Sequence, residues 1–378
     1  MDSLPVETLQ QIFEHACTDG GSTGNALSLT SKQIRAAARR ARFHTLRVAA
    51  DSDAFPEFVA FFEHECNSGQ IGRPCVRHLH LTLSSVPFIP PNIAQTTRTL
   101  QNPPTYPASH ELQAGRIPNS LATPLEGSDP ELPYCRPRAV EELFRLVAPD
   151  LRSLVVYSAP HGLPRDLRYP ILKHTFPLLR EAAFIGLPGP ADLLSRDWDA
   201  KLPPVLFPRA THLYLSPRIY EPELRLSAWS VLAPRVTHLH VSGARIPIHV
   251  YQLAEAVGVH VQVTRSPLRR VAVLPNSLPP PPLPSPPTYP SVRYLLMEPA
   301  AKPQGRTCGN FLRGQMAVWN GLSDIVRECH RRVDGNVKAT LLRMPDTVSY
   351  EQRAKVLSDQ WVERVEGGEG WWKGVELD

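Results

Sequence analysis

Apolar residues recur along the chain in a fixed spacing, in which one apolar residue is followed by others three and five positions later. In six of seven occurrences a proline stands two residues ahead of the first apolar position, and in the seventh Pro267 stands directly ahead. A proline cannot continue a helix and holds its predecessor in extended geometry. The spacing therefore predicts seven short strands in one register, with first apolar positions Val76, Leu151, Leu179, Ala210, Val236, Leu268 and Val292.

Segments with helical periodicity precede or separate several of these strands, namely residues 139–148, 169–176, 223–233 and 250–258. Helices that alternate with strands predict parallel pairing. From Leu151 onward the first apolar positions are 24 to 32 residues apart. The longer interval before Leu151 contains residues 86–138, which we interpret as a surface insertion rich in Pro, Thr, Asn and Ser.

The spacing resembles the L-x-x-L-x-L core of leucine-rich repeats, whose period is about 20–29 residues. The Asn or Cys expected after that core is missing here. The resemblance implies an α/β fold in which an irregular solenoid with parallel strands spans residues 74–300. Residues 275–290 hold nine prolines and are expected to form an extended linker or loop within it.

Polar and aromatic residues alternate with the apolar ones in the predicted strands. If Leu239 and Val241 point into the core, His238 and His240 lie on the opposite face, which we expect to be exposed. Pairing of successive strands would set His212 beside His238 and Tyr214 beside His240. Three interpretations stay open: a solvated polar face, a zinc site, or a recognition surface whose candidate substrate contacts are His80, His212, Tyr214, His238 and His240.

The first 48 residues predict two amphipathic helices. In the segment LPVETLQQIFEHAC, residues 4–17, an apolar stripe runs through Leu9, Ile12, Phe13 and Ala16. A loop is predicted over residues 18–25. A second helix over residues 26–42 would bury Ile34, Ala37, Ala38 and Ala41, with basic residues on its other faces.

These helices resemble the F-box family, which opens with L-P-x-E and continues with I-F. Here Leu4, Pro5, Glu7, Ile12 and Phe13 match, while Thr30, Ser31 and Ile34 replace the usual Val, Cys and Trp of the second half. The resemblance implies docking onto the Skp-family adaptor of a cullin–RING ubiquitin ligase, with the solenoid holding an unknown protein substrate. It implies the adaptor-binding candidates Leu4, Pro5, Ile12, Phe13, Leu27, Leu29 and Ile34. The alternative is an F-box scaffold without a ligase role.

The sequence pattern of residues 306–378 predicts a helix, a strand and a second helix, followed by Trp371 and Trp372. We interpret this segment as a cap over the open end of the array. A contribution to substrate binding is the alternative. The expected domains are therefore residues 1–48, 74–300 and 306–378.

Composition excludes several other classes. The net charge of +5 over 378 residues is modest, so neither nucleic acid nor a membrane is expected as a partner. Six scattered cysteines and the lack of a signal or membrane-spanning segment favour a reducing cytoplasmic or nuclear setting. The sequence GGSTG around Ser22 matches a hydrolase elbow, but that motif follows a strand and here it follows a predicted helix. No enzymatic activity, cofactor or metal is expected.

Overall fold

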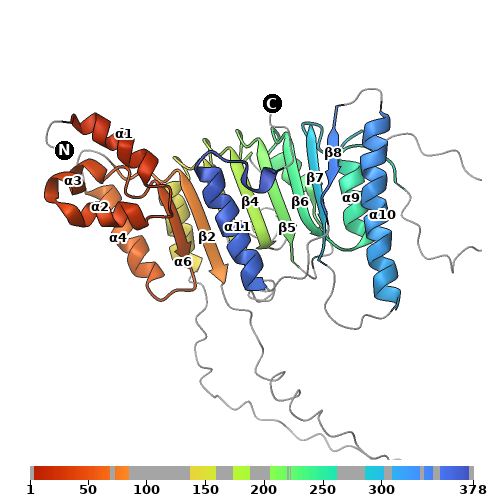
Figure 1. Cartoon of the computed structure of the whole chain (residues 1–378), viewed down its shortest axis with the longest axis horizontal. Coiled ribbons are helices and arrows are strands. Elements are labelled where there is room, and N and C mark those ends of the chain that lie inside the picture. The colour runs from red at the N-terminus through yellow and green to blue at the C-terminus, as the bar shows by residue number, and fades with distance from the viewer. Residues whose placement is uncertain are drawn as a thin grey trace, which may run out of the picture.

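The computed structural model describes residues 4–68, 73–84, 137–158, 173–187, 205–218, 221, 223–261, 286–301, 309–332, 336–343 and 350–373. Within them the chain forms one parallel sheet of eight strands, which follow one another in sequence order (Figure 1). The strands are β1 (Thr45–Ala49), β2 (His78–Ser84), β3 (Ser153–Ser158), β4 (Glu181–Leu187), β5 (His212–Pro217), β6 (His238–Ala244), β7 (Tyr294–Pro299) and β8 (Lys338–Leu341).

The predicted register is confirmed. Leu213 pairs with Leu239 and Leu215 pairs with Val241, so the apolar positions of neighbouring strands stack into continuous rows. These rows form the main core with helices that cover one face of the sheet. The helices are α4 (Phe55–Asn67), α6 (Pro137–Val147), α8 (Leu226–Leu232), α9 (Pro247–Ala256) and α10 (Gly309–Arg331). The predicted helices at 139–148, 223–233 and 250–258 correspond to α6, α8 and α9.

Helix α6 shows why these segments are helical. Its buried residues include Val140, Leu143, Phe144 and Val147, which follow the spacing of one helix face. That face packs into the main core, while Glu142 and Arg145 on the outside form an ion pair three residues apart. The helices of the array therefore form because each has an apolar stripe that the sheet covers.

Two strands differ from the prediction. Strand β1 was not predicted, although Phe43, Leu46 and Val48 repeat the apolar spacing, because no proline stands ahead of Phe43. The predicted boundary at residue 48 consequently falls inside β1, which pairs with β2. The strand predicted after Leu268 lies outside the described residues, and β6 pairs directly with β7, so no strand separates them. Leu268 was the occurrence whose proline was out of phase with the others.

Two further predictions fall mainly on residues outside the described ranges, namely the insertion at 86–138 and the proline-rich loop at 275–290. Of the helix predicted at 169–176, only residues 173–176 are described, and the prediction is wrong for them because they form no α-helix.

The N-terminal residues form three helices, α1 (Val6–Ala16), α2 (Ser22–Thr30) and α3 (Lys32–Ala38). The prediction of a single helix over residues 26–42 is wrong because the chain turns extended at Ser31, with φ −158° and ψ 163°. The Ser31 hydroxyl oxygen accepts a hydrogen bond of 3.1 Å from the Ile34 amide and so caps α3. The predicted loop at 18–25 is shorter than expected, since α2 begins at Ser22.

The three helices share a small core of their own. It contains Leu9, Phe13 and Cys17 of the first helical segment, packed against Ala37, Ala38 and Ala41. The predicted stripe on α1 is therefore wrong for Ile12 and Ala16, which are exposed, because the buried face is rotated toward Cys17.

The C-terminal helix, strand and helix are confirmed as α10, β8 and α11 (Tyr350–Val365), followed by the short helix η4 (Gly370–Trp372). Helix α10 packs on α9 and β8, and β8 extends the sheet beyond β7. Helix α11 does not close the end of the array as the cap prediction expected. It returns across the sheet face opposite the main core, where Figure 1 shows it in front of the strands.

Candidate partner-binding surfaces

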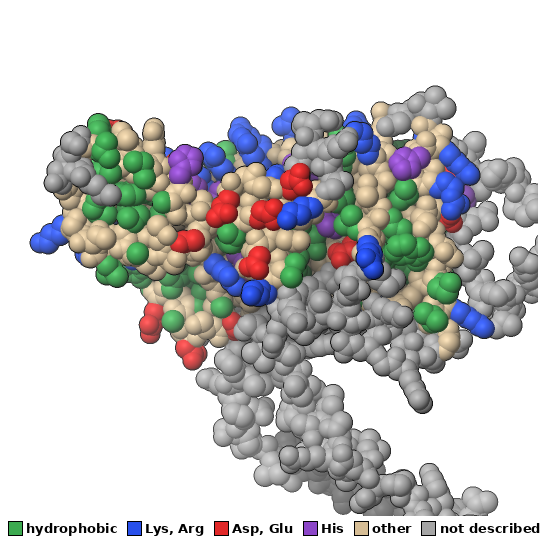
Figure 2. Space-filling view, viewed as in Figure 1, with side chains coloured by type: hydrophobic (Ala, Val, Ile, Leu, Met, Phe, Trp, Pro, Cys, Tyr) green, Lys and Arg blue, Asp and Glu red, His purple; other side chains and the backbone are tan. Residues whose placement is uncertain are grey.

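The N-terminal helices carry exposed apolar side chains. Leu4, Pro5 and Val6 at the start of α1 are exposed, and so are Ile12 at 48% and Leu29 at 78%. Figure 2 shows hydrophobic side chains gathered at this end of the molecule. Large apolar residues exposed together are typical of a surface that binds another protein. We call Leu4, Pro5, Val6, Ile12 and Leu29 the N-terminal apolar surface.

The remaining predicted adaptor contacts pack inward. Phe13 is buried in the core of the three helices, and Leu27 and Ile34 are partly buried against it. Four of the seven predicted contacts, Leu4, Pro5, Ile12 and Leu29, are therefore accessible to a partner, whereas Phe13 is not. Phe13, Leu27 and Ile34 instead hold the three helices together.

The GGSTG segment serves as a helix start. Asp19 accepts hydrogen bonds from the Ser22 hydroxyl and from the Thr23 amide, the latter at 2.9 Å, which ties down the first turn of α2. Helix α1 precedes the segment, so the strand that a hydrolase elbow requires is not there. Gly24 instead allows close packing, because a Cβ atom there would lie 2.4 Å from the Arg42 carbonyl oxygen.

The predicted pairing on the second sheet face is confirmed. The His212 and His238 rings stack with centroids 4.2 Å apart, and the Tyr214 and His240 rings meet edge to face at 4.6 Å. Tyr294 continues the first row by stacking on His238 at 4.4 Å. A ladder of aromatic and imidazole rings thus crosses β5, β6 and β7.

The expectation that this face is exposed is wrong. The side chains of His80 and Tyr214 are buried, and His240 is only 4% exposed. The cover comes from α11 and η4: Trp361 lies 5.3 Å from the His80 ring, and Trp372 lies 5.0 Å from the His212 ring. Leu357 and Trp371 complete this second core. The five candidate substrate contacts therefore lie under or against the C-terminal segment.

Burial also fixes the charge of these imidazoles. It lowers the pKa of His80 to about 4 and that of His212 to about 3, so both are neutral at pH 7. In the described part of the chain, no group of three or more His, Cys, Asp or Glu side chains is placed to hold a metal ion.

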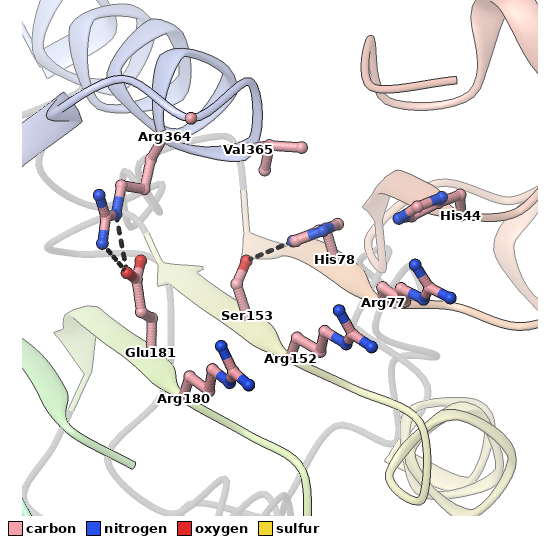
Figure 3. A pocket seen from close by; sticks show the side chains of 10 residues that line it. His44, Arg77, His78, Arg152, Ser153, Arg180, Glu181, Arg364 and Val365 are labelled. Carbon is pink, nitrogen blue, oxygen red and sulfur yellow. Dashed lines mark hydrogen bonds and ion pairs between the residues drawn. The ribbon is translucent and has the colours of Figure 1, made fainter. Parts of the chain in front are cut away.

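A cavity of about 340 Å³ opens beside α11, at the ends of β2, β3 and β4 where these strands begin. Figure 3 shows Arg77, Arg152 and Arg180 extending in the same direction from three successive strands. The cavity is lined by His44, Arg77, His78, Arg152, Ser153, Arg180, Glu181, Arg364, Val365 and Gly367.

The floor and the mouth of this cavity differ. His44 and Ser153 are buried at the floor, where the Ser153 hydroxyl lies 3.2 Å from His78 Nδ1. Arg152 and Arg180 are exposed at the mouth. Burial, together with neighbouring positive charges, lowers the pKa of His44 to about 4 and that of His78 to about 3.

Sequence reasoning did not single out these arginines, although the signal was present. Arg77, Arg152 and Arg180 each stand directly before the first residue of a strand, as Arg293 does before β7. A residue type repeated at one position of a repeat forms a row in the folded array, since successive strands lie about 4.8 Å apart.

The chain matches no protein-family model and no curated protein. None of the helices in the described ranges is long and apolar enough to cross a membrane.

Proposed function

We propose that the chain is the substrate-recognition subunit of a cullin–RING ubiquitin ligase. In this proposal the N-terminal helices bind a Skp-family adaptor, and the array behind them is an irregular leucine-rich-repeat-like solenoid that holds a target protein. The observation that carries the proposal is the N-terminal apolar surface, because it falls on the segment whose sequence resembles an F-box.

The apolar residues that pack the three helices are different from those that are exposed, and this difference supports adaptor binding. Leu9, Phe13 and Cys17 satisfy the packing of the three helices, so Ile12 is not needed for that core. Leu29 likewise points away from it and is the most exposed large apolar residue described. Residues that cost solubility and add nothing to the described core are best explained by a partner that covers them.

The array supports the receptor role through its shape. Each strand pairs only with its neighbours in sequence, as in solenoids, and a rigid array can hold a target at a fixed distance from an adaptor. Such a receptor performs no chemistry of its own. It raises the effective concentration of a target lysine near the conjugating enzyme.

The covered sheet face changes where a target could bind. His80, Tyr214 and His240 cannot contact a target while α11 and η4 lie over them. We therefore place target binding on the outer surfaces of the array rather than on the imidazole ladder. The same observation favours the second candidate, an F-box-bearing scaffold, because the face that solenoids commonly use for binding is occupied within the chain.

Co-purification tests the proposal. The full chain should capture a Skp-family adaptor together with the cullin, and replacing Ile12 and Leu29 by Asp should weaken adaptor capture by about tenfold or more. Leu312→Asp is the matched control, since Leu312 is an exposed apolar residue on α10 at the other end of the array. Capture of the adaptor without the cullin would support the scaffold. No capture, or equal capture by the double variant, would contradict both.

A further inference from the structure

We propose that the cavity at the start of β2, β3 and β4 binds a small organic anion that carries phosphate groups, held by Arg77, Arg152 and Arg180. This inference does not depend on adaptor binding, so that either proposal can fail while the other stands.

Charge is the first argument. Four arginines line the cavity, against a single carboxylate, Glu181. That carboxylate is already paired with Arg364. Arg77 contacts Glu14 at 3.3 Å, but Arg152 and Arg180 form no ion pair with any carboxylate of the described residues. The cavity therefore carries an excess of positive charge that the described protein does not neutralise.

The arginines also act on one another. Although the Arg152 side chain is largely exposed, partial desolvation of its guanidinium and the positive charges of Arg77 and Arg180 lower its pKa. Like charges held side by side destabilise the folded chain. An anion bound in the cavity would offset this repulsion. The arginine row therefore lowers the stability of the ligand-free fold, and a bound anion would restore it.

The spacing of the row suits phosphate. Arg77, Arg152 and Arg180 leave the backbone directly before three successive strands, whose backbones lie about 4.8 Å apart, and they extend in the same direction (Figure 3). Each guanidinium presents a planar fork of N–H donors that matches two phosphate oxygens. A single carboxylate could occupy only one fork, whereas a molecule with two phosphate groups could engage neighbouring forks and carry enough charge to offset them.

The size of the cavity favours a small molecule. Its volume of about 340 Å³ lies at the lower end of the range for ligand sites. The floor is polar, because the Ser153 hydroxyl lies there in contact with His78 Nδ1 and accepts a hydrogen bond from Trp361 Nε1. The mouth is formed by the exposed Arg152 and Arg180, which can close on the anion without displacing a buried side chain.

Calorimetric titration of the full chain with pyrophosphate tests the inference. We expect saturable binding at low ionic strength and neutral pH. Arg152→Gln and Arg180→Gln should each raise the dissociation constant about tenfold, because each removes a charge-assisted fork. Arg293→Gln is the matched control: Arg293 holds the same position before β7 but does not line the cavity. All three side chains are exposed, so these variants are expected to fold.

The pKa values of the two histidines at the cavity floor give a second readout. A bound anion should raise the pKa of His44 and His78 in the wild-type chain, and this rise should be lost in Arg152→Gln. A phosphoserine peptide serves as the comparison ligand. Pyrophosphate that fails to bind, or that binds the arginine variants as tightly as the wild type, overturns the inference. The inference is also overturned if the peptide binds in a way that depends on the arginines and pyrophosphate cannot displace it.

Discussion

Arg364 on α11 donates a hydrogen bond of 2.7 Å from Nε to the Glu181 carboxylate at the start of β4, across 183 residues of sequence. One strand away, Trp361 Nε1 donates to the Ser153 hydroxyl at 3.3 Å. These two polar contacts fix where α11 lies along the strands, while Trp361, Trp371 and Trp372 supply the apolar area. The C-terminal helix is therefore held in one position on the sheet and is part of the folded array.

We expect the Arg364–Glu181 pair to stabilise the fold measurably. Both side chains are largely buried, so solvent screens their interaction less than it screens a surface pair. Arg364→Gln should lower the free energy of unfolding by about 2 kcal/mol. The measurement is urea denaturation of the two single variants and of the double variant with Glu181→Gln. Losses that simply add, with no coupling energy between the two positions, would contradict it.

Trp361 should be the main apolar anchor of α11. Its side chain is among the largest that are fully buried, so Trp361→Ala should cost about 3–5 kcal/mol in the free energy of unfolding. Val356→Ala on the same helix should cost less than about 0.5 kcal/mol, because Val356 is exposed. Denaturant unfolding of both variants checks this contrast, and similar losses at the two positions would rule out the described placement of α11.

Acid should destabilise the chain in the range between pH 6.5 and 4. Because burial lowers the pKa of His80 to about 4, the folded chain resists its protonation while the unfolded chain takes up a proton near pH 6.5. The stability that depends on neutral His80 is complete above pH 6.5 and falls as the pH drops toward 4. The slope per group is at most about 1.4 kcal/mol per pH unit.

The check is urea unfolding at several pH values with the wild type and His80→Gln. The variant should show a shallower fall in stability between pH 6.5 and 4, whatever its stability at neutral pH. The pKa of His44 is also lowered to about 4, so in that variant His44 still contributes to the fall of the free energy of unfolding with pH. Parallel curves for the two proteins would show that His80 is accessible to protons in the folded chain.

Gly24→Ala should destabilise the chain, although replacing a helical glycine by alanine usually stabilises a protein. Alanine in place of a helical glycine normally stabilises by about 1 kcal/mol. At Gly24 the added methyl group would lie too close to the Arg42 backbone, so we expect a loss of about 1–3 kcal/mol. Gly314→Ala on α10 has open space and should show the normal gain. Thermal unfolding separates the two, and a gain at both positions would refute the close packing.

Much of the sheet could be predicted because the sequence pattern of each strand lies within a few neighbouring residues. Alternation of side chains fixes which residues share a face, and the prolines set the phase, so Leu239 and Val241 were placed in the core correctly. Where the proline was out of phase, before Leu268, the predicted strand does not enter the sheet between β6 and β7.

The burial of the second face could not be predicted in the same way. Nothing near His240 in the sequence indicates that a helix more than a hundred residues later covers it. The apolar side of α11 consists of Leu357 and Trp361, whereas Val356 on the same helix is exposed. The arginine row was missed for a related reason: its members matter only once the strands align them.

The order of the strands along the chain has a consequence during synthesis. Ribosomes release β1 to β6 and their helices well before residues 350–373, and each of those strands can pair as soon as its predecessor has folded. Until α11 emerges, the rings of Tyr214, His240 and their neighbours face water or a chaperone. The nascent protein thus completes its N-terminal helices first and covers the second face of its sheet last, so a premature stop codon ahead of residue 350 would leave an otherwise formed sheet with an exposed apolar face.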